Sequence, residues 1–157
     1  MAHPNVGELA PGFNLQDQDG NAVNLEHFID KSLVVLFFYP KAMTPGCTTQ
    51  ACGIRDIKDE LENRGVVAFG ISPDPVDRLP KFIAKHDLNF SLLSDEDHAV
   101  AESYGCWGLK KFMGKEFMGL IRTTFIIGKD GKLLKVMDKF KTKSHHDDLL
   151  NVLDELI

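Results

Sequence analysis

Two continuous apolar runs in the first half of the chain define its most regular pattern. Residues 32–40 and 66–72 are rich in valine and phenylalanine, which is typical of strands that are buried on both faces. Between them, apolar side chains recur every three or four residues over 48–64, and Gly65 provides a stop for the helix that this spacing predicts. The pattern indicates parallel strands joined by a helical crossover.

Shorter segments complete the expected fold. Asp-Gly pairs at 19–20 and 130–131 each separate two strand-like segments, which predicts a hairpin at each place. Asp77 is expected to cap the helix after the second buried strand, because Pro80 has to lie in its first turn. We also expect a strand at 90–93, a helix at 97–104, a long loop at 105–119, and a last helix capped by Ser144 that buries Leu149, Leu150, Leu153 and Ile157.

Strands that alternate with helices predict an α/β fold, with a central mixed sheet, helices on both faces and an N-terminal β-hairpin. No linker or repeat divides residues 1–157, and a single domain is therefore expected. The formal net charge of −5 gives no general attraction to nucleic acid or to anionic lipid. Because the N-terminus does not resemble a signal and no apolar stretch reaches about 18 residues, we expect a cytoplasmic protein with no membrane partner.

Cys47 and Cys52 lie at the junction between the first buried strand and its helix. In open α/β sheets, functional sites lie beyond the carboxyl ends of the strands, and Cys47 falls in that zone. The first turn of a helix favours a reactive thiolate, because unpaired amides and the helix dipole stabilise negative charge. Thr44, three residues before Cys47, has a hydroxyl that can donate to the sulfur or to a bound ligand.

The residues alone leave several interpretations of the two cysteines open. A lone cysteine at a helix start is more often a packed side chain. Zinc is a competitor, but Cys-x4-Cys is wider than the common zinc clip, and the histidines at 145–146 are isolated in the sequence. The spacing excludes a Cys-x-x-Cys motif. A disulfide between Cys47 and Cys52 is the third interpretation, and it requires the helix to open, because residues five apart differ by about 500° of rotation.

Residues 40–47, PKAMTPGC, fit P-x-x-x-T-x-x-C, the active-site motif of the peroxiredoxins. Together with PGCTTQACGIRD, LLSDEDH, WGLKKFMGKEFMG and IRTTFII, they make nearly the whole chain resemble the bacterioferritin comigratory protein (peroxiredoxin Q) branch. The resemblance implies a thioredoxin-like fold and an atypical two-cysteine thiol peroxidase that reduces hydrogen peroxide and organic hydroperoxides. It also implies recycling by thioredoxin or a similar dithiol protein, with no metal or other cofactor.

The same resemblance implies roles for individual residues. Cys47 would be the peroxidatic cysteine and Cys52 the resolving one, and the two would form an intramolecular disulfide. Pro40 would shield the pocket, while Thr44 and Arg122 would bind the peroxide. The permanent charge of a guanidinium suits Arg122 to stabilise both the thiolate and the charge that develops on the leaving oxygen.

Two residues, two alternative functions and the oligomeric state lie outside this assignment. Cys106 stands where the family more often has an aliphatic residue, and it is expected to be a packed small side chain; Trp107 is expected to pack locally. A general thiol-disulfide oxidoreductase on the same fold is the alternative enzyme, and a redox sensor or chaperone-like module is the non-enzymatic alternative. A monomer is expected, with a weak dimer as the other possibility.

Overall fold

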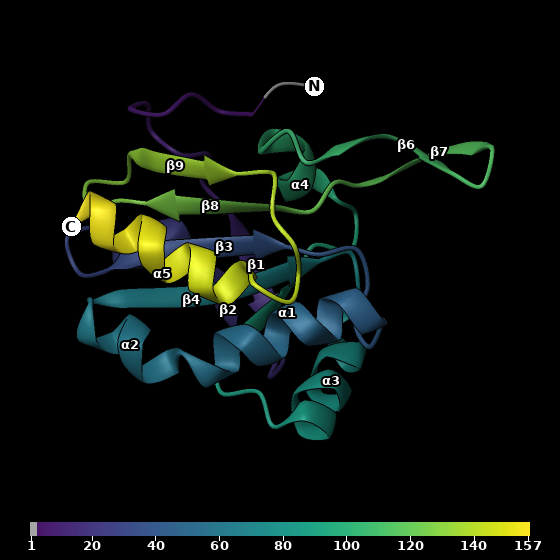
Figure 1. Ribbon diagram of the computed structural model, residues 1–157, viewed down its shortest axis with the longest axis horizontal. Helices are drawn as coiled ribbons and strands as arrows, with labels where there is room; N and C mark the ends of the chain where they lie inside the picture. The colour runs from purple at the N-terminus through teal and green to yellow at the C-terminus, as the bar shows by residue number, and fades with distance from the viewer. Residues whose placement is uncertain (1–2) are drawn as a thin grey trace.

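A seven-stranded mixed β-sheet forms the centre of the structure, a computed structural model that describes residues 3–157 (Figure 1). In the order in which they pair, the strands are β2 (Ala22–Asn24), β1 (Asn14–Asp17), β5 (Ser91–Ser94), β4 (Val66–Ser72), β3 (Leu33–Phe38), β8 (Thr123–Ile127) and β9 (Leu133–Met137). β3, β4 and β5 are parallel, and antiparallel pairs extend the sheet on both sides. The predicted mixed sheet and both predicted Asp-Gly hairpins are confirmed.

The central strand β3 is buried on both faces, as its continuous apolar sequence predicts. Val35 and Phe37 point into the core on one face of the sheet, and Leu36 and Phe38 into the core on the other. β3 pairs with antiparallel β8, in which Thr123 lies opposite Phe38. The residue just before β8 is therefore brought to the carboxyl end of β3, next to the loop that leads into the first helix.

Helices cover both faces of the sheet, as predicted (Figure 1). One face carries α1 (Pro45–Asp56), α2 (Lys58–Asn63), α3 (Leu79–His86) and α5 (His145–Leu156), and the other carries α4 (Ala99–Ser103). Two short 3-10 turns, η1 (Leu25–Phe28) and η2 (Val76–Arg78), precede β3 and α3. Within residues 3–157, no helix is both long enough and apolar enough to cross a membrane.

The helix predicted over 48–64 is wrong in its bounds. It begins earlier, at Pro45, because proline is well suited to the first turn, where its missing N–H costs no hydrogen bond. It also ends early, at Asp56, because Ile57 leaves helical geometry with φ −105° and ψ 17°. The backbone N–H of Ile57 bonds to Ile54, and α2 begins directly afterwards.

Three expectations about the later helices need correction. Asp77 does not cap α3, because η2 runs directly into that helix through Arg78, which already has helical geometry; Pro80 lies in the first turn as expected. Ser144 does precede α5, but its side chain makes no capping hydrogen bond. Ile157 is 67% exposed rather than buried, because it lies beyond the end of α5.

The long loop predicted at 105–119 is wrong, because this segment forms a two-stranded hairpin that projects from the body of the molecule (Figure 1). Its strands are β6 (Trp107–Phe112) and β7 (Lys115–Leu120). Met113 and Gly114 join them with φ values of 51° and 78°. Positive φ at both central residues is typical of a type I′ turn, which is usually marked by Asn-Gly or Asp-Gly. Met113 gives no such signal in the sequence.

Candidate active site

Cys47 lies in the first turn of α1, just beyond the carboxyl end of β3. Pro45 is the first residue of the helix, and Thr44 precedes it with extended geometry. Backbone N–H groups in this turn have no partner within the helix, and their dipoles stabilise a negative charge at Cys47. Because the Cys47 side chain is only 1% exposed, bulk water screens that charge poorly.

Arg122 contacts Cys47 from the neighbouring strand. It directly precedes β8, and its Nη2 donates to Cys47 Sγ at 3.3 Å. The guanidinium also lies against Gly46, where a Cβ would be 3.4 Å from Nη2. A buried sulfur, the start of a helix and a permanent cation therefore meet at one point.

Gln50 also binds the Arg122 guanidinium, and the sequence pattern did not single out this residue. Its side chain is fully buried, and its Oε1 accepts a 2.7 Å hydrogen bond from Arg122 Nη1. The guanidinium is therefore held at two points on α1, Gln50 and Cys47. The sequence did hold a signal for Gln50, because it is a polar residue one turn after Cys47. It lies on the helix face that also carries the apolar residues Ala51 and Ile54.

Thr44 and Pro40 lie in the loop between β3 and α1, and both are half-buried. The Thr44 hydroxyl donates to the Lys41 carbonyl at 2.8 Å, and not to the sulfur, which was one of the two acceptors considered. Its oxygen still has acceptor capacity. Pro40 follows the buried Tyr39, at the point where β3 leaves the sheet.

A buried carboxylate, also missed in the sequence, fixes the shape of this loop. Asp74 Oδ2 accepts from the Ala42 backbone N–H at 2.7 Å and from the Ser72 hydroxyl at 2.8 Å. Met43, the next residue of the loop, has φ 65°, a left-handed geometry that costs energy in a residue with a Cβ. The hydrogen bond at Ala42 helps to hold the backbone in that strained form next to Cys47.

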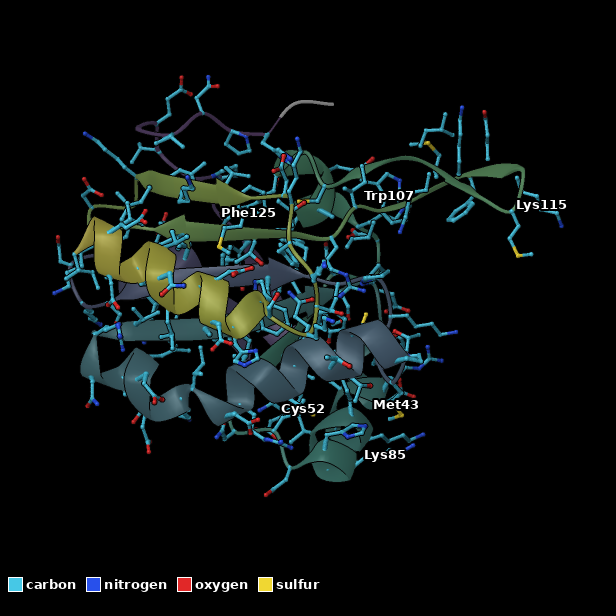
Figure 2. All side chains as sticks on the ribbon, in the orientation of Figure 1. Met43, Cys52, Lys85, Trp107, Lys115 and Phe125 are labelled. Carbon is cyan, nitrogen blue, oxygen red and sulfur yellow. The ribbon has the colours of Figure 1, made fainter. Side chains whose placement is uncertain are left out.

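Cys52 is half-buried, five residues after Cys47 on α1, and both are free thiols. Figure 2 labels Cys52 on this helix. For an unbroken α-helix, that spacing puts the two Cα atoms roughly 8.6 Å apart. A disulfide requires about 4.4 to 6.8 Å, and the helical form therefore keeps the two sulfurs from bonding.

The remaining candidates make contacts of other kinds. Cys106 is fully buried in the core on the opposite face of the sheet, and burial raises its pKa to about 12. Trp107 stacks on His98 with ring centroids 3.8 Å apart, which confirms local packing. His145 is buried and bonds Thr124 Oγ1 through Nε2 at 2.8 Å, and burial lowers its pKa to about 3. Among the described side chains, no cluster of three or more potential metal ligands occurs.

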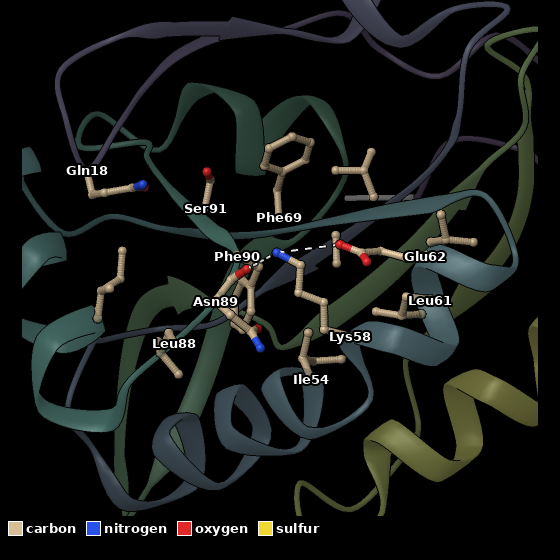
Figure 3. A pocket seen from close by; sticks show the side chains of 14 residues that line it. Gln18, Ile54, Lys58, Leu61, Glu62, Phe69, Leu88, Asn89, Phe90 and Ser91 are labelled. Carbon is tan, nitrogen blue, oxygen red and sulfur yellow. Dashed lines mark hydrogen bonds and ion pairs between the residues drawn. The ribbon is translucent and has the colours of Figure 1, made fainter.

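A cavity of about 410 Å³ opens between α1, α2 and the first half of β4 (Figure 3). Lys58 reaches across it to the Asn89 carbonyl and lies 3.8 Å from Glu62. Because β3 and β4 are parallel, this half of β4 is at the end of the sheet far from Cys47. No cysteine lines the cavity, and we assign it no part in chemistry at Cys47.

Comparison with known proteins identifies the family of the chain. The model of the AhpC/TSA family matches residues 6–136. Peroxiredoxin Bcp of Escherichia coli K12 is 55% identical over 150 residues, 96% of each chain. Peroxiredoxin Bcp of Bacillus subtilis is 43% identical over 151 residues, again 96% of each chain.

Solved structures show the same fold. Peroxidoxin BcpB of Mycobacterium tuberculosis has a TM-score of 0.86 at 38% identity, over 99% of both chains. A mutant of peroxiredoxin Q of Xylella fastidiosa has a TM-score of 0.92 at 25% identity, also over 99% of both chains. The bacterioferritin comigratory protein of Xanthomonas campestris, studied for alkyl peroxide reduction, has a TM-score of 0.86 at 29% identity and covers 92% of this chain and 91% of its own. The predicted thioredoxin-like fold is confirmed.

Proposed function

The chain belongs to the AhpC/TSA family as a peroxiredoxin of the Bcp group, and on this premise we propose how its residues divide the reaction. The protein is a thiol peroxidase. Cys47 acts as the peroxidatic cysteine and Cys52 as the resolving cysteine. The observation that carries the assignment is the 3.3 Å contact from Arg122 Nη2 to Cys47 Sγ in the first turn of α1.

In the first step the Cys47 thiolate attacks one oxygen of the peroxide. A sulfur–oxygen bond forms, the oxygen–oxygen bond breaks, and the leaving oxygen takes up a proton as water or an alcohol. The sulfur loses two electrons and becomes a sulfenic acid. Arg122 stabilises the thiolate before the attack and the charge on the leaving oxygen during it, while Gln50 keeps the guanidinium in place.

Pro40 and Thr44 shape the pocket in this proposal. Pro40, half-buried at the end of β3, limits access of water to Cys47. Because the Thr44 hydroxyl already donates to Lys41, its oxygen serves the peroxide as an acceptor for the hydroxyl proton. Hydrogen peroxide and organic hydroperoxides both carry such a proton, and both are proposed substrates.

In the second step the Cys52 sulfur displaces the hydroxyl group of the Cys47 sulfenic acid. Water leaves, and an intramolecular disulfide forms without further oxidant. Because the two cysteines are too far apart on an intact α1, the helix has to open locally around Cys52. A dithiol protein of the thioredoxin type then returns two electrons and two protons, which restores both thiols.

We further propose that the protein is a single domain over residues 1–157 that acts in the cytoplasm as a monomer. No cofactor is needed, because sulfur carries both electrons. No nucleic acid or membrane partner is required, since the oxidising substrate is a small peroxide and the reducing substrate is a soluble dithiol protein. Sedimentation velocity of the reduced and oxidised forms tests the monomer, and a dimer in both forms contradicts it.

The decisive test is peroxide consumption coupled to thioredoxin, thioredoxin reductase and NADPH, with Cys47→Ser as the control. A thiol peroxidase consumes peroxide at the expense of NADPH, and the control does not. A general thiol-disulfide oxidoreductase exchanges with protein disulfides but reduces peroxide no faster than a free thiol. A sensor or chaperone-like module is oxidised once and shows no sustained turnover.

A further inference from the structure

Gly53, the residue directly after Cys52, lies against the ring of His146 at the start of α5. A Cβ at position 53 would lie 2.5 Å from His146 Nδ1 and 2.9 Å from its Cγ. Carbon atoms of a side chain do not approach other atoms so closely, and only glycine fits this point of contact. α1 and α5 lie on the same face of the sheet (Figure 1), and this contact joins α5 to the cysteine turn of α1.

The His146 ring is held in place without a hydrogen bond of its own. Its Nδ1 is buried and has no partner among the described residues, and its Nε2 lies 3.7 Å from Asp147 Oδ1. The preceding residue, His145, is anchored to Thr124 of β8 and packs on Phe140 with ring centroids 4.5 Å apart. This anchor fixes the start of α5 to the sheet, and the sheet in turn holds the His146 ring against Gly53.

We propose that His146 is a positioning residue that sets the rate of disulfide formation. This inference rests on the proposed function, in which α1 has to open around Cys52 before the two sulfurs meet. The His146 ring touches Gly53 only while that turn is helical, and the contact therefore stabilises the closed form over the open form. Arg122 and Gln50 hold the Cys47 end of α1, and His146 holds the Cys52 end.

The rate of opening decides between two fates of the oxidised Cys47. If α1 opens, Cys52 displaces the hydroxyl group, water leaves and the disulfide forms. If α1 stays closed, a second peroxide molecule transfers an oxygen atom to the sulfenic acid, which becomes a sulfinic acid while that peroxide is reduced. His146 therefore also sets how much enzyme is lost to overoxidation at a given peroxide concentration.

Removal of the ring should release the helix. His146→Ala should speed disulfide formation by about threefold to tenfold, as expected for loss of a partly buried packing contact, and should lower the sulfinic share accordingly. His146→Phe keeps a ring against Gly53 without the imidazole nitrogens. It should retain a rate close to that of the unmodified protein, because packing and not hydrogen bonding carries the effect.

A second substitution at the same contact should act in the opposite direction. In Gly53→Ala with His146→Ala, the added methyl group meets no ring, and alanine favours the helix over glycine. Disulfide formation should be slower than in His146→Ala alone by about fivefold, which corresponds to the difference in helix propensity between the two residues. A general loss of stability cannot speed disulfide formation in His146→Ala and then slow it again when Gly53→Ala is added.

Val152→Ala is the matched control, because Val152 is also a partly buried residue of α5 that packs against the same core. It should lower the free energy of unfolding but leave the rate of disulfide formation and the sulfinic share unchanged. Urea unfolding of each variant separates this global effect from the local one.

The experiment is a single-turnover quench series after addition of peroxide, with dimedone to trap sulfenic acid and mass spectrometry to count disulfide and sulfinic acid. Faster disulfide formation in His146→Ala, with sulfenic acid formation unchanged, supports the proposal. An unchanged or slower second step in that variant overturns it, as does an equal acceleration in Val152→Ala. An unmodified protein that forms no sulfenic acid at Cys47 overturns the proposed function, and this inference with it.

Discussion

Cys47 and Cys106 are equally buried, at 1% and 0% exposure, yet one sulfur accepts a hydrogen bond and the other donates one. Cys47 accepts a hydrogen bond from the Arg122 guanidinium, which an electron-rich thiolate does best. Cys106 donates to the Tyr104 carbonyl at 3.7 Å, which requires its proton, and burial raises its pKa to about 12. Burial alone therefore does not mark a reactive thiol, and the neighbouring donors decide.

The largest effect is expected from Cys47→Ser, which should abolish peroxide reduction because a serine oxygen cannot replace the sulfur that peroxide oxidises. Cys52→Ser should still react once with peroxide and then stop as sulfenic acid or overoxidise. Stopped-flow consumption of one equivalent of peroxide separates the two variants. Equal loss of this first step in both would show that the two roles are wrongly assigned.

Arg122→Met tests the donor that distinguishes the two thiols. It should slow peroxide reduction by at least about a hundredfold, because a preorganised charged donor is worth several kcal/mol where charge develops. The measurement is the pre-steady-state rate of peroxide consumption. A rate equal to that of the unmodified protein would mean that the contact in the structure is not used in the reaction.

Gln50→Met keeps the size of the side chain but removes the hydrogen bond that holds Arg122. Peroxide reduction should fall by about tenfold, the usual cost of a hydrogen bond to a charged group. The measurement is again the pre-steady-state rate. A rate equal to that of the unmodified protein would show that Cys47 alone suffices to orient the guanidinium.

The smallest effect is expected from Cys106→Ser, which should leave thioredoxin-dependent turnover nearly unchanged. In the native protein, Cys106 should resist alkylation at neutral pH and react only after unfolding, because its proton is retained. Steady-state kinetics and peptide mapping after peroxide treatment check both points. A dominant disulfide that includes Cys106 would contradict the separation of the two thiols by the sheet.

Much of the fold was predictable because burial leaves a direct pattern in the sequence. The apolar runs of β3 and β4 and the Asp-Gly turns need no tertiary information. The hairpin at 105–119 was missed because its sequence shows no clear period and its turn uses Met113 in a left-handed geometry. The break of the helix at Ile57 leaves no glycine or proline as a signal.

The candidate site divides in the same way. The strand-to-helix junction pointed to Cys47, Cys52 and Thr44, and a family resemblance added Pro40 and Arg122. The structure brings Arg122 into contact with Cys47. Gln50 and Asp74 were not named, and His146 was considered only as a zinc ligand. Each of the three acts through a partner far away in the sequence. Such pairs depend on how helices and strands meet, and no local pattern reports them.

Cys47 lies in a helix, whereas Arg122 lies in the segment that directly precedes strand β8 of the sheet. On the proposed mechanism, α1 opens around Cys52, while Arg122 and Gln50 hold the Cys47 end of the helix in place. After reduction, the site is rebuilt by helix formation, which takes on the order of 0.1 to 1 μs in peptides. A typical enzyme turns over about ten times per second, which is far slower than helix formation. Arrival of the reductant, and not refolding of the helix, therefore limits recovery of the site.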